Sequence, residues 1–293
     1  MRNIAVIVHW GPAEPTVELA RELNRSTLLH RVAVVANDLS ERPEDIPAEI
    51  AWMVPSRNLG FAGGFQHATR VYPTASCYLL LNNDIRMDDA TIGACLDLLS
   101  TDRVGVVGPT LVNARGLQSG AAVLTRFLAA PRVLRTPAAS QPCEAEWVTG
   151  AAMFIKAECH RDVPMDGRYF LGFEDADFCH RARDAGWRVM LSPARAWHAS
   201  GGTIPSGRYI YYSIRNRLWF VRARGWALRT ALVTLWSVLV LLPGTALKDA
   251  VRRRGYMSCL LAFHGLVDGL LRMPADGAPL PDEPRPARWV SWS

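Results

Sequence analysis

The first hundred residues alternate between short apolar runs and stretches whose apolar positions recur at helical spacing. An apolar run of about five residues bounded by polar or turn residues is typical of a buried strand, and spacing of three or four is typical of a helix. The order along the chain is strand, helix, strand, strand, helix and strand: Ile4–Val8, Thr16–Ser26, Val32–Ala36, Ala51–Val54, Gly64–Tyr72 and Tyr78–Leu81. Such alternation predicts an α/β fold with a mainly parallel, doubly wound sheet and flanking helices.

The same pattern continues more loosely beyond residue 85. A helix over Ala90–Ser100 and a strand over Val104–Val107 are predicted, followed by a Pro- and Ala-rich stretch, Ala129–Pro142, that is typical of a mobile loop. The apolar segment Trp147–Lys156 then predicts another strand.

Three polar segments follow predicted strands or precede a predicted helix: Asn37-Asp38, Asn58–Gly64 and Asn82–Asp84. In an open parallel sheet, ligands bind beyond the carboxyl ends of the strands. We therefore expect the three segments to converge on one crevice.

The segment 170–198 places three acids, Glu174, Asp175 and Asp177, at the start of a predicted helix that ends at Ala185-Gly186. One interpretation is structural, because acids favour the first turn of a helix and Asp177 can pair with Arg181 one turn later. The other is a catalytic base beside a metal site, with the acids facing solvent or a cleft. This segment alone favours neither.

The composition is that of a globular protein. A chain of 293 residues with 49% apolar and 20% charged residues can bury a large core, as one domain or as a domain with an appendage. Its six cysteines follow no metal or disulfide spacing, which favours a reducing cytosol. The N-terminal MRNIAVIVHW runs directly into a strand and does not resemble a signal peptide.

The net charge of +6 is concentrated in the C-terminal region. Residues 1–207 hold 20 Lys and Arg against 22 Asp and Glu, whereas 208–254 hold ten basic residues and one acid, Asp249. Within that region Thr230–Leu247 is uncharged and of about the minimum length that spans a bilayer. Basic flanks around an apolar helix favour contact with an anionic membrane surface, while a buried helical hairpin or an oligomer interface is the alternative. Nucleic acid is less consistent with so apolar a run.

Two motifs carry candidate chemistry. The strand in YLLLNNDI ends in Asn82-Asn83-Asp84, where a hard cation bridging a diphosphate can be held, although Asn and Asp also simply terminate strands. The turn NLGFAGG over Asn58–Gly64 can bring backbone close to a phosphate or a base, or serve as a tight turn only.

Taken together, the ordered motifs resemble family two of the inverting glycosyltransferases, in particular its rhamnosyltransferase-like members. The resemblance covers roughly residues 3–220 and is carried by IAVIVHW, the strand ending at Asn37, NLGFAGG, NND, WVTGAA, EDAD and the late Trp-His pair. It implies a GT-A fold, a catalytic domain over 1–207 with a nucleotide-sugar half at about 1–110 and an acceptor half at about 111–207, and a helical region over 208–293 for membrane association or oligomerisation.

The resemblance also implies roles for particular residues. Asp175 is the expected general base, with Glu174 and Asp177 supporting it; Asp84 and His198 are the expected ligands of Mg²⁺ or Mn²⁺. Trp147, Gly150 and Arg215 are expected to contact acceptor or diphosphate. The residues expected to bind the nucleotide sugar are His9, Asn37, Asp38, Asn58, Gly60, Phe61, Gly64, Asn82 and Asn83.

Two positions depart from the family pattern. Asn37-Asp38 stands in reversed order where the family usually has Asp before Asn, and Asn82 replaces the first acid of the commoner metal-binding triplet. The resemblance therefore implies altered base recognition or a shifted Asp38, and a weak metal site.

The activity implied is transfer of a sugar, rhamnose by the style of the motifs, from a thymidine- or uridine-diphosphate donor to a hydroxyl of a glycan or polyprenyl-diphosphate-linked saccharide. Cell-wall or surface polysaccharide synthesis at the cytoplasmic face of the plasma membrane is the expected setting. The apolar C-terminal region is alternatively expected to form a homodimer interface. The alternative is a non-catalytic nucleotide-sugar-binding or scaffold protein on the same fold. A nucleotidyltransferase is disfavoured, because His9-Trp10-Gly11 is followed by Pro12 and acids and not by a basic Gly-rich loop.

Overall fold

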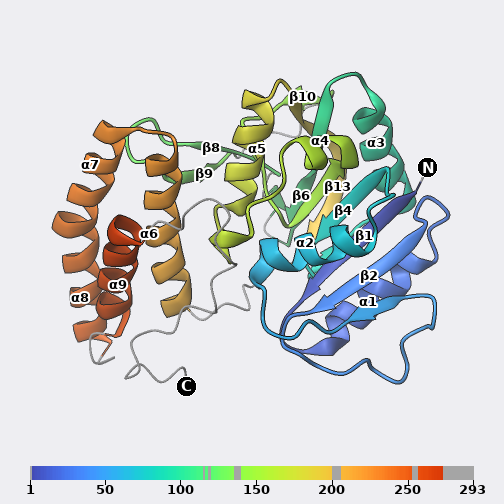
Figure 1. Cartoon of the computed structure of the whole chain (residues 1–293), viewed down its shortest axis with the longest axis horizontal. Helices are drawn as coiled ribbons and strands as arrows, with labels where there is room; N and C mark the ends of the chain where they lie inside the picture. Colours follow the sequence, from blue (N-terminus) through green and yellow to red (C-terminus); the bar gives the residue numbers. More distant parts are fainter. Residues whose placement is uncertain are drawn as a thin grey trace. The chain divides into compact units, whose positions relative to one another are not determined.

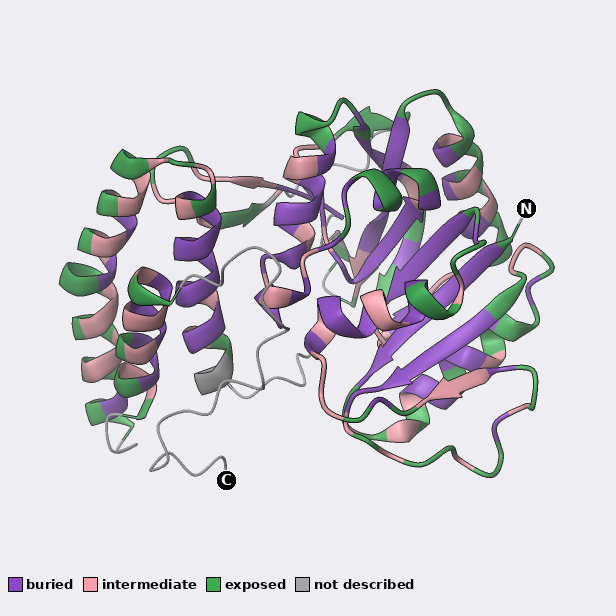
Figure 2. Ribbon diagram, in the orientation of Figure 1, coloured by how far each residue is buried: buried purple, intermediate pink, exposed green. Residues whose placement is uncertain are grey.

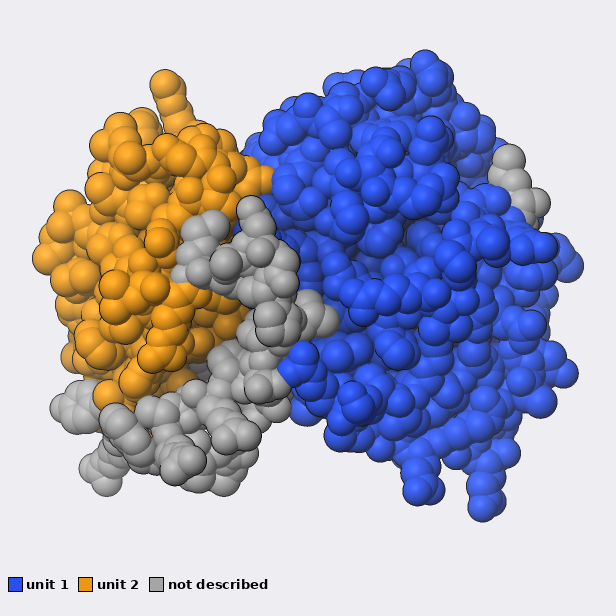
Figure 3. All heavy atoms as spheres, viewed as in Figure 1, with its two compact units in different colours: residues 1–123, 132–170, 174–201 blue, residues 124–131, 171–173, 202–293 orange. Residues whose placement is uncertain are grey.

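The fold is taken from a computed structural model, which describes residues 2–114, 116–117, 120–134, 140–199, 206–252 and 257–272. The chain divides into two compact units (Figure 3). Unit 1 comprises 1–123, 132–170 and 174–201, and unit 2 comprises 124–131, 171–173 and 202–293. The assignment of 1–207 as a catalytic domain stays a prediction, since it concerns activity.

Unit 1 is built on one large sheet (Figure 1). From edge to edge the strands are β10 (Cys143–Glu144), β13 (Arg188–His198), β6 (Val104–Asn113), β12 (Ala152–Lys156), β4 (Cys77–Leu81), β1 (Asn3–His9), β2 (Arg31–Ala36) and β3 (Ala51–Met53). β4, β1, β2 and β3 run parallel, and so do β13 and β6. β12 lies antiparallel between β4 and β6. The predicted fold class, a mainly parallel α/β sheet with flanking helices, is thus observed.

Shorter strands extend the large sheet and form a second, smaller one. β5 (Ile85–Arg86) pairs with the end of β13, β7 (Gly116–Leu117) pairs with β6, and β11 (Trp147–Val148), β8 (Ala121–Leu124) and β9 (Pro131–Val133) form a separate small sheet. The single strand expected over Trp147–Lys156 is therefore two strands in two sheets, broken at Thr149–Ala151. β9 lies inside the predicted loop Ala129–Pro142, of which 135–139 fall outside the described residues.

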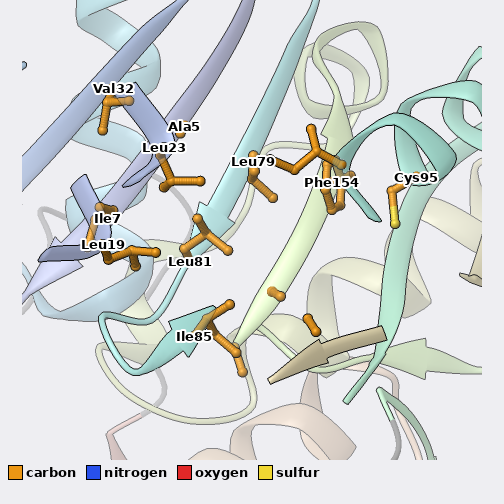
Figure 4. Close-up of a cluster of buried hydrophobic side chains, with 14 of the residues drawn as sticks. Ala5, Ile7, Leu19, Leu23, Val32, Leu79, Leu81, Ile85, Cys95 and Phe154 are labelled. Atoms are coloured by element: carbon orange, nitrogen blue, oxygen red, sulfur yellow. The ribbon is translucent and has the colours of Figure 1, made fainter. Parts of the chain in front are cut away.

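Helices cover both faces of the large sheet. α1 (Ala13–Asn24) and α3 (Asp89–Ser100) bury Leu19, Leu23 and Cys95 against alternate strand residues such as Ile7, Val32, Leu79 and Phe154 (Figure 4). Strand side chains alternate between faces, so Tyr78 points the other way from Leu79. There it meets Phe65 of α2 (Gly60–Val71) and His160 of α4 (Ala157–Asp162), with ring centroids 5.7 and 5.9 Å away.

The helix predicted to begin at the three acids is α5 (Glu174–Asp184), which packs on β11 and β13. It follows the 3₁₀ turn η1 (Gly167–Tyr169) in the chain. Predicted and observed boundaries elsewhere differ by a few residues, most at β6, which runs on to Asn113. The six cysteines all lie within the described residues and are free thiols there.

The described C-terminal part of unit 2, residues 206–252 and 257–272, is mainly helical. α6 (Ser206–Ala223) packs on α9 (Met257–Leu271) and on α7 (Ala227–Trp236); a π-helical turn, η2 (Ser237–Leu241), joins α7 to α8 (Leu242–Val251), which also packs on α9. α7, η2 and α8 form one helix over Ala227–Val251, which by length and composition is apolar enough to cross a membrane. A core of Ile214, Leu218, Val233, Ala262 and Leu266 holds the helices together.

The start of α2 depends on a glycine. Gly60 has φ +71°, and a Cβ there would collide with the backbone of Phe170, which itself has φ +63°. We expect Gly60→Ala to lower the free energy of unfolding by about 2–4 kcal/mol, because a left-handed residue gains strain and rigid backbone blocks the new methyl group. Gly93→Ala in α3 is the matched control: its Cβ would lie 3.7 Å from Leu28, and the change should stay within about 1 kcal/mol of wild type. Urea unfolding curves of the two variants measure this, and equal stabilities would contradict the packing described.

Candidate active site

Three parallel strands end at the same edge of the large sheet. β4, β1 and β2 are neighbours in register, so the residues at or just after their carboxyl ends, Asn82, His9 and Asn37, lie side by side. The three polar segments lie close together within unit 1: hydrogen bonds join Asn37 to the glycine turn, and Thr16 and His9 connect Asn83 to Asp38. That they form one crevice for a ligand stays a prediction.

The first group of bonds centres on His9, which is fully buried. Its Nδ1 lies 2.7 Å from Thr16 Oγ1 and its Nε2 lies 3.2 Å from Asp38 Oδ2. Thr16 Oγ1 also accepts a hydrogen bond of 3.1 Å from Asn83 Nδ2. His9, Asp38 and Asn83 therefore belong to one network, bridged by Thr16.

The protonation of this network follows from its chemistry. Burial lowers the pKa of His9, and the nearby Asp38 opposes the shift only in part, so the ring is neutral near pH 7. A carboxylate only accepts hydrogen bonds, so the hydrogen of the neutral ring sits on Nε2, facing Asp38. Nδ1 is then an acceptor, and the Thr16 hydroxyl donates to it.

The second group of bonds fixes the glycine turn. Asn37 Nδ2 donates to Gly60 O at 2.7 Å and Asn37 Oδ1 accepts from the Leu59 N–H at 3.2 Å. Asn58 Oδ1 accepts from the Gly60 N–H at 2.9 Å. A Cβ on Gly64 would lie 3.1 Å from Asn37 Nδ2, so the turn packs tightly on the end of β2. These amides shape the turn, and their predicted contact with a nucleotide stays a prediction.

Asp175 lies in the first turn of α5 and is held by backbone donors. Its Oδ2 accepts a hydrogen bond of 2.9 Å from the Gly150 N–H, and its Oδ1 accepts one of 2.7 Å from the Ala176 N–H. Burial is the largest influence on its pKa and raises it, against the lowering effect of these N–H groups. A carboxylate with a raised pKa has the character of a general base.

Gly150 also joins Asp175 to the glycine turn and to β4. A Cβ at Gly150 would lie 3.0 Å from the ring of Phe61 and 3.6 Å from Asp175 Cβ, so the three residues touch where glycine leaves room. The next carbonyl, that of Ala151, accepts from the Asn82 N–H at 2.9 Å. The motifs NLGFAGG, NND and EDAD thus each contact the WVTGAA motif.

Asp84 and His198 also come together. β5 pairs with β13 in register His198 to Ile85, which leaves Asp84 Oδ1 3.4 Å from His198 Nε2. The two side chains are 29% and 15% exposed, so both are reachable by a ligand. The described residues contain no group of three His, Cys, Asp or Glu side chains that could hold a metal. One carboxylate and one imidazole fit a Mg²⁺ or Mn²⁺ ion only if diphosphate and water supply the remaining ligands.

The other two acids of the EDAD motif point inward. Asp177 is 3% exposed and accepts hydrogen bonds from Tyr169 Oη at 3.2 Å and Arg181 Nε at 2.7 Å. Glu174 is 5% exposed. The expectation that all three acids face solvent or a cleft is wrong for Asp177, whose carboxylate is paired inside the protein. The structural interpretation thus holds for Asp177, and the catalytic role of Asp175 stays a prediction.

Trp147 and Arg215 are both buried. Trp147, in β11, is 6% exposed. Arg215 belongs to unit 2 and is 1% exposed; its guanidinium lies 4.1 Å from the Trp219 ring centroid and 4.9 Å from that of Tyr212, and burial lowers its pKa. In this structure the guanidinium is enclosed by aromatic rings, and its predicted contact with a phosphate stays a prediction.

Sequence reasoning missed three features. Thr16, Ala151 and the strained Phe170 all contribute to the site through single atoms or backbone, which no side-chain pattern signals. A hint existed for Thr16, since a hydroxyl in the first turn of the helix after β1 can face the end of that strand. In unit 2, Asn216 was also missed; its Nδ2 donates to Leu171 O at 2.9 Å and Gly172 O at 2.6 Å.

No protein-family model matches the chain, and no curated protein matches it in sequence. Its fold, however, is similar to that of solved glycosyltransferase structures. GalNAc-T7 with UDP, GalNAc and Mn²⁺ superposes with a TM-score of 0.62 and 13% identity over 75% of this chain, which spans 47% of that protein's length. TarS 1-349 of S. aureus with UDP-GlcNAc gives 0.57 and 11%, covering 92% of this chain and 81% of that one.

The mannosyltransferase PcManGT of Pyrobaculum calidifontis with GDP-Man and Mn²⁺ gives a TM-score of 0.52 and 14% identity over 92% of this chain and 87% of that one. These likenesses establish the GT-A type of α/β fold that the motifs predicted.

The raised pKa of Asp175 makes a prediction about stability. When a carboxyl group has a higher pKa in the folded than in the unfolded state, the protein becomes less stable as the pH rises from the unfolded-state pKa to the folded-state pKa. Asp175→Asn loses one of the two oxygens that accept hydrogen bonds from the backbone N–H groups of Gly150 and Ala176, a cost that does not depend on pH. It also removes the penalty of ionising the carboxyl, so its unfolding temperature relative to wild type should fall as the pH is lowered from 7 toward the pKa of an ordinary Asp. Thermal unfolding at several pH values measures this. A loss of stability that grows with pH would mean that the carboxylate is a stabilising helix charge.

Proposed function

We propose that the protein is an inverting glycosyltransferase that moves a sugar from a nucleoside-diphosphate donor to a hydroxyl of a glycan or lipid-linked saccharide. The observation that carries the proposal is the Asp175 carboxylate, whose pKa is raised and which accepts a hydrogen bond from Gly150. The neighbouring Ala151 carbonyl accepts from Asn82, two residues before Asp84, which pairs with His198. The GT-A fold shared with nucleotide-sugar-dependent enzymes supports it.

In the proposed reaction Asp175 accepts the proton of the acceptor hydroxyl while that oxygen attacks C1 of the donor sugar. The new bond between oxygen and C1 forms as the bond from C1 to the phosphate oxygen breaks, and the electron pair leaves with the diphosphate. Attack from the face opposite the leaving group inverts the anomeric centre. Asp84 and His198 are the residues that would hold Mg²⁺ or Mn²⁺, and such an ion would supply positive charge to neutralise the departing diphosphate. Asp38 and Asn83 bind the nucleoside at the edge of the sheet, and the buried His9 holds Thr16 and Asp38 in place behind them.

For the donor we propose rhamnose on thymidine diphosphate, with UDP-sugars as the next candidates, on the resemblance of the motifs. A polyprenyl-diphosphate-linked saccharide, a role in cell-wall or surface polysaccharide synthesis and action at the cytoplasmic face of the plasma membrane complete the proposal. The basic, apolar helices of unit 2 support the membrane setting. A panel of nucleotide sugars, scored by thermal shift and by diphosphate release with acceptor present, tests the donor.

Asp175→Asn should lower kcat by about 10²–10⁴-fold, the contribution of a general base, while leaving donor affinity nearly unchanged. For wild type the rate should fall as the pH drops through the raised pKa of Asp175, at a higher pH than an exposed Asp would give. The matched control is Asp89→Asn, an exposed acid in the first turn of α3. Steady-state kinetics across pH measure both effects. Nucleotide binding by a wild type that turns over none of the donors would instead favour the scaffold alternative.

Removing the side chain of either proposed metal ligand should weaken the binding of the metal ion. In the presence of a nucleoside diphosphate, Mn²⁺ should raise the unfolding temperature of wild type, by an amount equivalent to about 2.7 kcal/mol at a hundredfold excess over Kd. Asp84→Ala and His198→Ala should each lose most of this shift, and Asp89→Ala should keep it. Equal shifts in all four proteins would place the metal elsewhere.

A further inference from the structure

The long helix of unit 2, Ala227–Val251, has its polar side turned inward. Its buried residues are Val233, Ser237 and Asp249, at 0%, 0% and 1% exposure. The Ser237 hydroxyl donates to Val233 O at 2.7 Å, and Asp249 Oδ2 accepts from the Cys259 N–H at the start of α9 at 3.0 Å. Most surface helices of soluble proteins show the opposite arrangement, with polar residues outside.

The outward side of the same helix is apolar. We call the five residues on it the leucine face: Leu228, Leu235, Leu239, Leu247 and Val251. Their exposed fractions run from 55% to 76%. Figure 2 shows this helix mainly in the colours of exposed and intermediate residues. Exposed apolar surface that is continuous over one element marks an interaction site.

The π-helical turn makes that face continuous. The Leu242 N–H bonds to Ser237 O, five residues back, so one extra residue is fitted into the turn. In a plain α-helix Ser237 and Asp249 would point about 120° apart, and the extra residue reduces this to about 20°. The same extra residue places Leu247 and Val251 on the side of the helix that carries Leu228, Leu235 and Leu239. Pro243, which has no N–H, directly follows this turn.

The charges around the leucine face select its partner. Residues 206–248 contain no Asp or Glu, and Asp249 is buried. Arg222, Arg224 and Arg229 lie at the start of the helix, and Lys248 and Arg252 lie at its end. Arg253 and Arg254 follow in the sequence, outside the described residues.

Cations at both ends favour a helix that lies along the membrane surface. In that orientation both basic ends meet the headgroups of one anionic leaflet, whereas a spanning helix places one cluster on each side. Trp226, whose ring lies 4.0 Å from the guanidinium of Arg229, adds the aromatic residue typical of an interface. Spanning would also remove Val233 and Ser237 from the core of unit 2.

We propose that the leucine face binds the surface of a bilayer that contains anionic lipid, with the helix in the plane of the headgroups. The apolar side chains enter the acyl boundary, while the flanking cations bind phosphate groups of the lipids. Asp249 and Ser237 stay inside unit 2. This proposal is independent of the donor and of the chemistry at Asp175.

Vesicle binding of the full chain tests it, with no donor or acceptor present. Wild type should sediment with phosphatidylcholine vesicles that contain phosphatidylglycerol, bind pure phosphatidylcholine vesicles much more weakly, and be released by high salt. The double variant Leu235→Ser/Leu247→Ser should bind about tenfold or more weakly, because binding scales with the apolar area inserted. The matched control is Val54→Ser/Val71→Ser, two half-exposed valines of unit 1, which should bind like wild type.

A charge variant tests the proposal independently, in case the serine variant fails to bind only because it is misfolded. Lys248→Glu/Arg252→Glu alters only exposed side chains and should lose the preference for phosphatidylglycerol while unfolding at an unchanged temperature. Three results would overturn the proposal: wild-type binding by the serine variant, retention of wild type on vesicles through high salt and alkaline carbonate, which marks a spanning helix, or failure to bind vesicles together with dimerisation that the serine variant abolishes.

Discussion

The candidate site depends on one backbone hydrogen bond, from the Gly150 N–H to the Asp175 carboxylate. β12 runs antiparallel between β4 and β6, and its N-terminal approach brings Gly150 and Ala151 alongside the end of β4. Without a side chain, Gly150 lets Phe61 and Asp175 approach from two further segments. Residues from four parts of the chain are thereby fixed around one peptide group. Asp175 is desolvated enough to raise its pKa and still hydrogen-bonded enough to stay ordered.

Much of this arrangement was accessible from the sequence. The strands of the first half could be predicted because buried parallel strands are apolar throughout, and the carboxyl-end rule then placed Asn37, Asn58 and Asn82 together. The antiparallel β12 was not apparent, because strand direction depends on pairing partners far away in the sequence. The break at Thr149–Ala151 was also missed, since WVTGAAMFIK reads as one apolar run.

For single residues, the chemistry could be predicted from the sequence but the orientation of the side chains could not. Asp175 and Asp177 stand two apart in the first turn of α5, and their different environments follow from what packs on each side of the helix. Asp177 faces Tyr169 and Arg181, and Asp175 faces the Gly150 backbone. The pairing of Asp84 with His198 required β5 to register with β13, which no local pattern predicts. The inverted polarity of the helix in unit 2 was equally hidden, because a π-helical turn changes the phase of the periodicity on which such predictions rest.

The network around His9 has a direction. Asn83 donates to Thr16 and Thr16 donates to His9, whose other ring nitrogen lies 3.2 Å from Asp38 Oδ2, so the network ends on a carboxylate. A molecule bound next to Asp38 therefore has to bring its own hydrogens: a sugar hydroxyl or a ring N–H is matched there, and a phosphate is repelled. Under the proposed function, a nucleotide at this edge would therefore place its nucleoside toward β2 and its phosphates toward the end of β4.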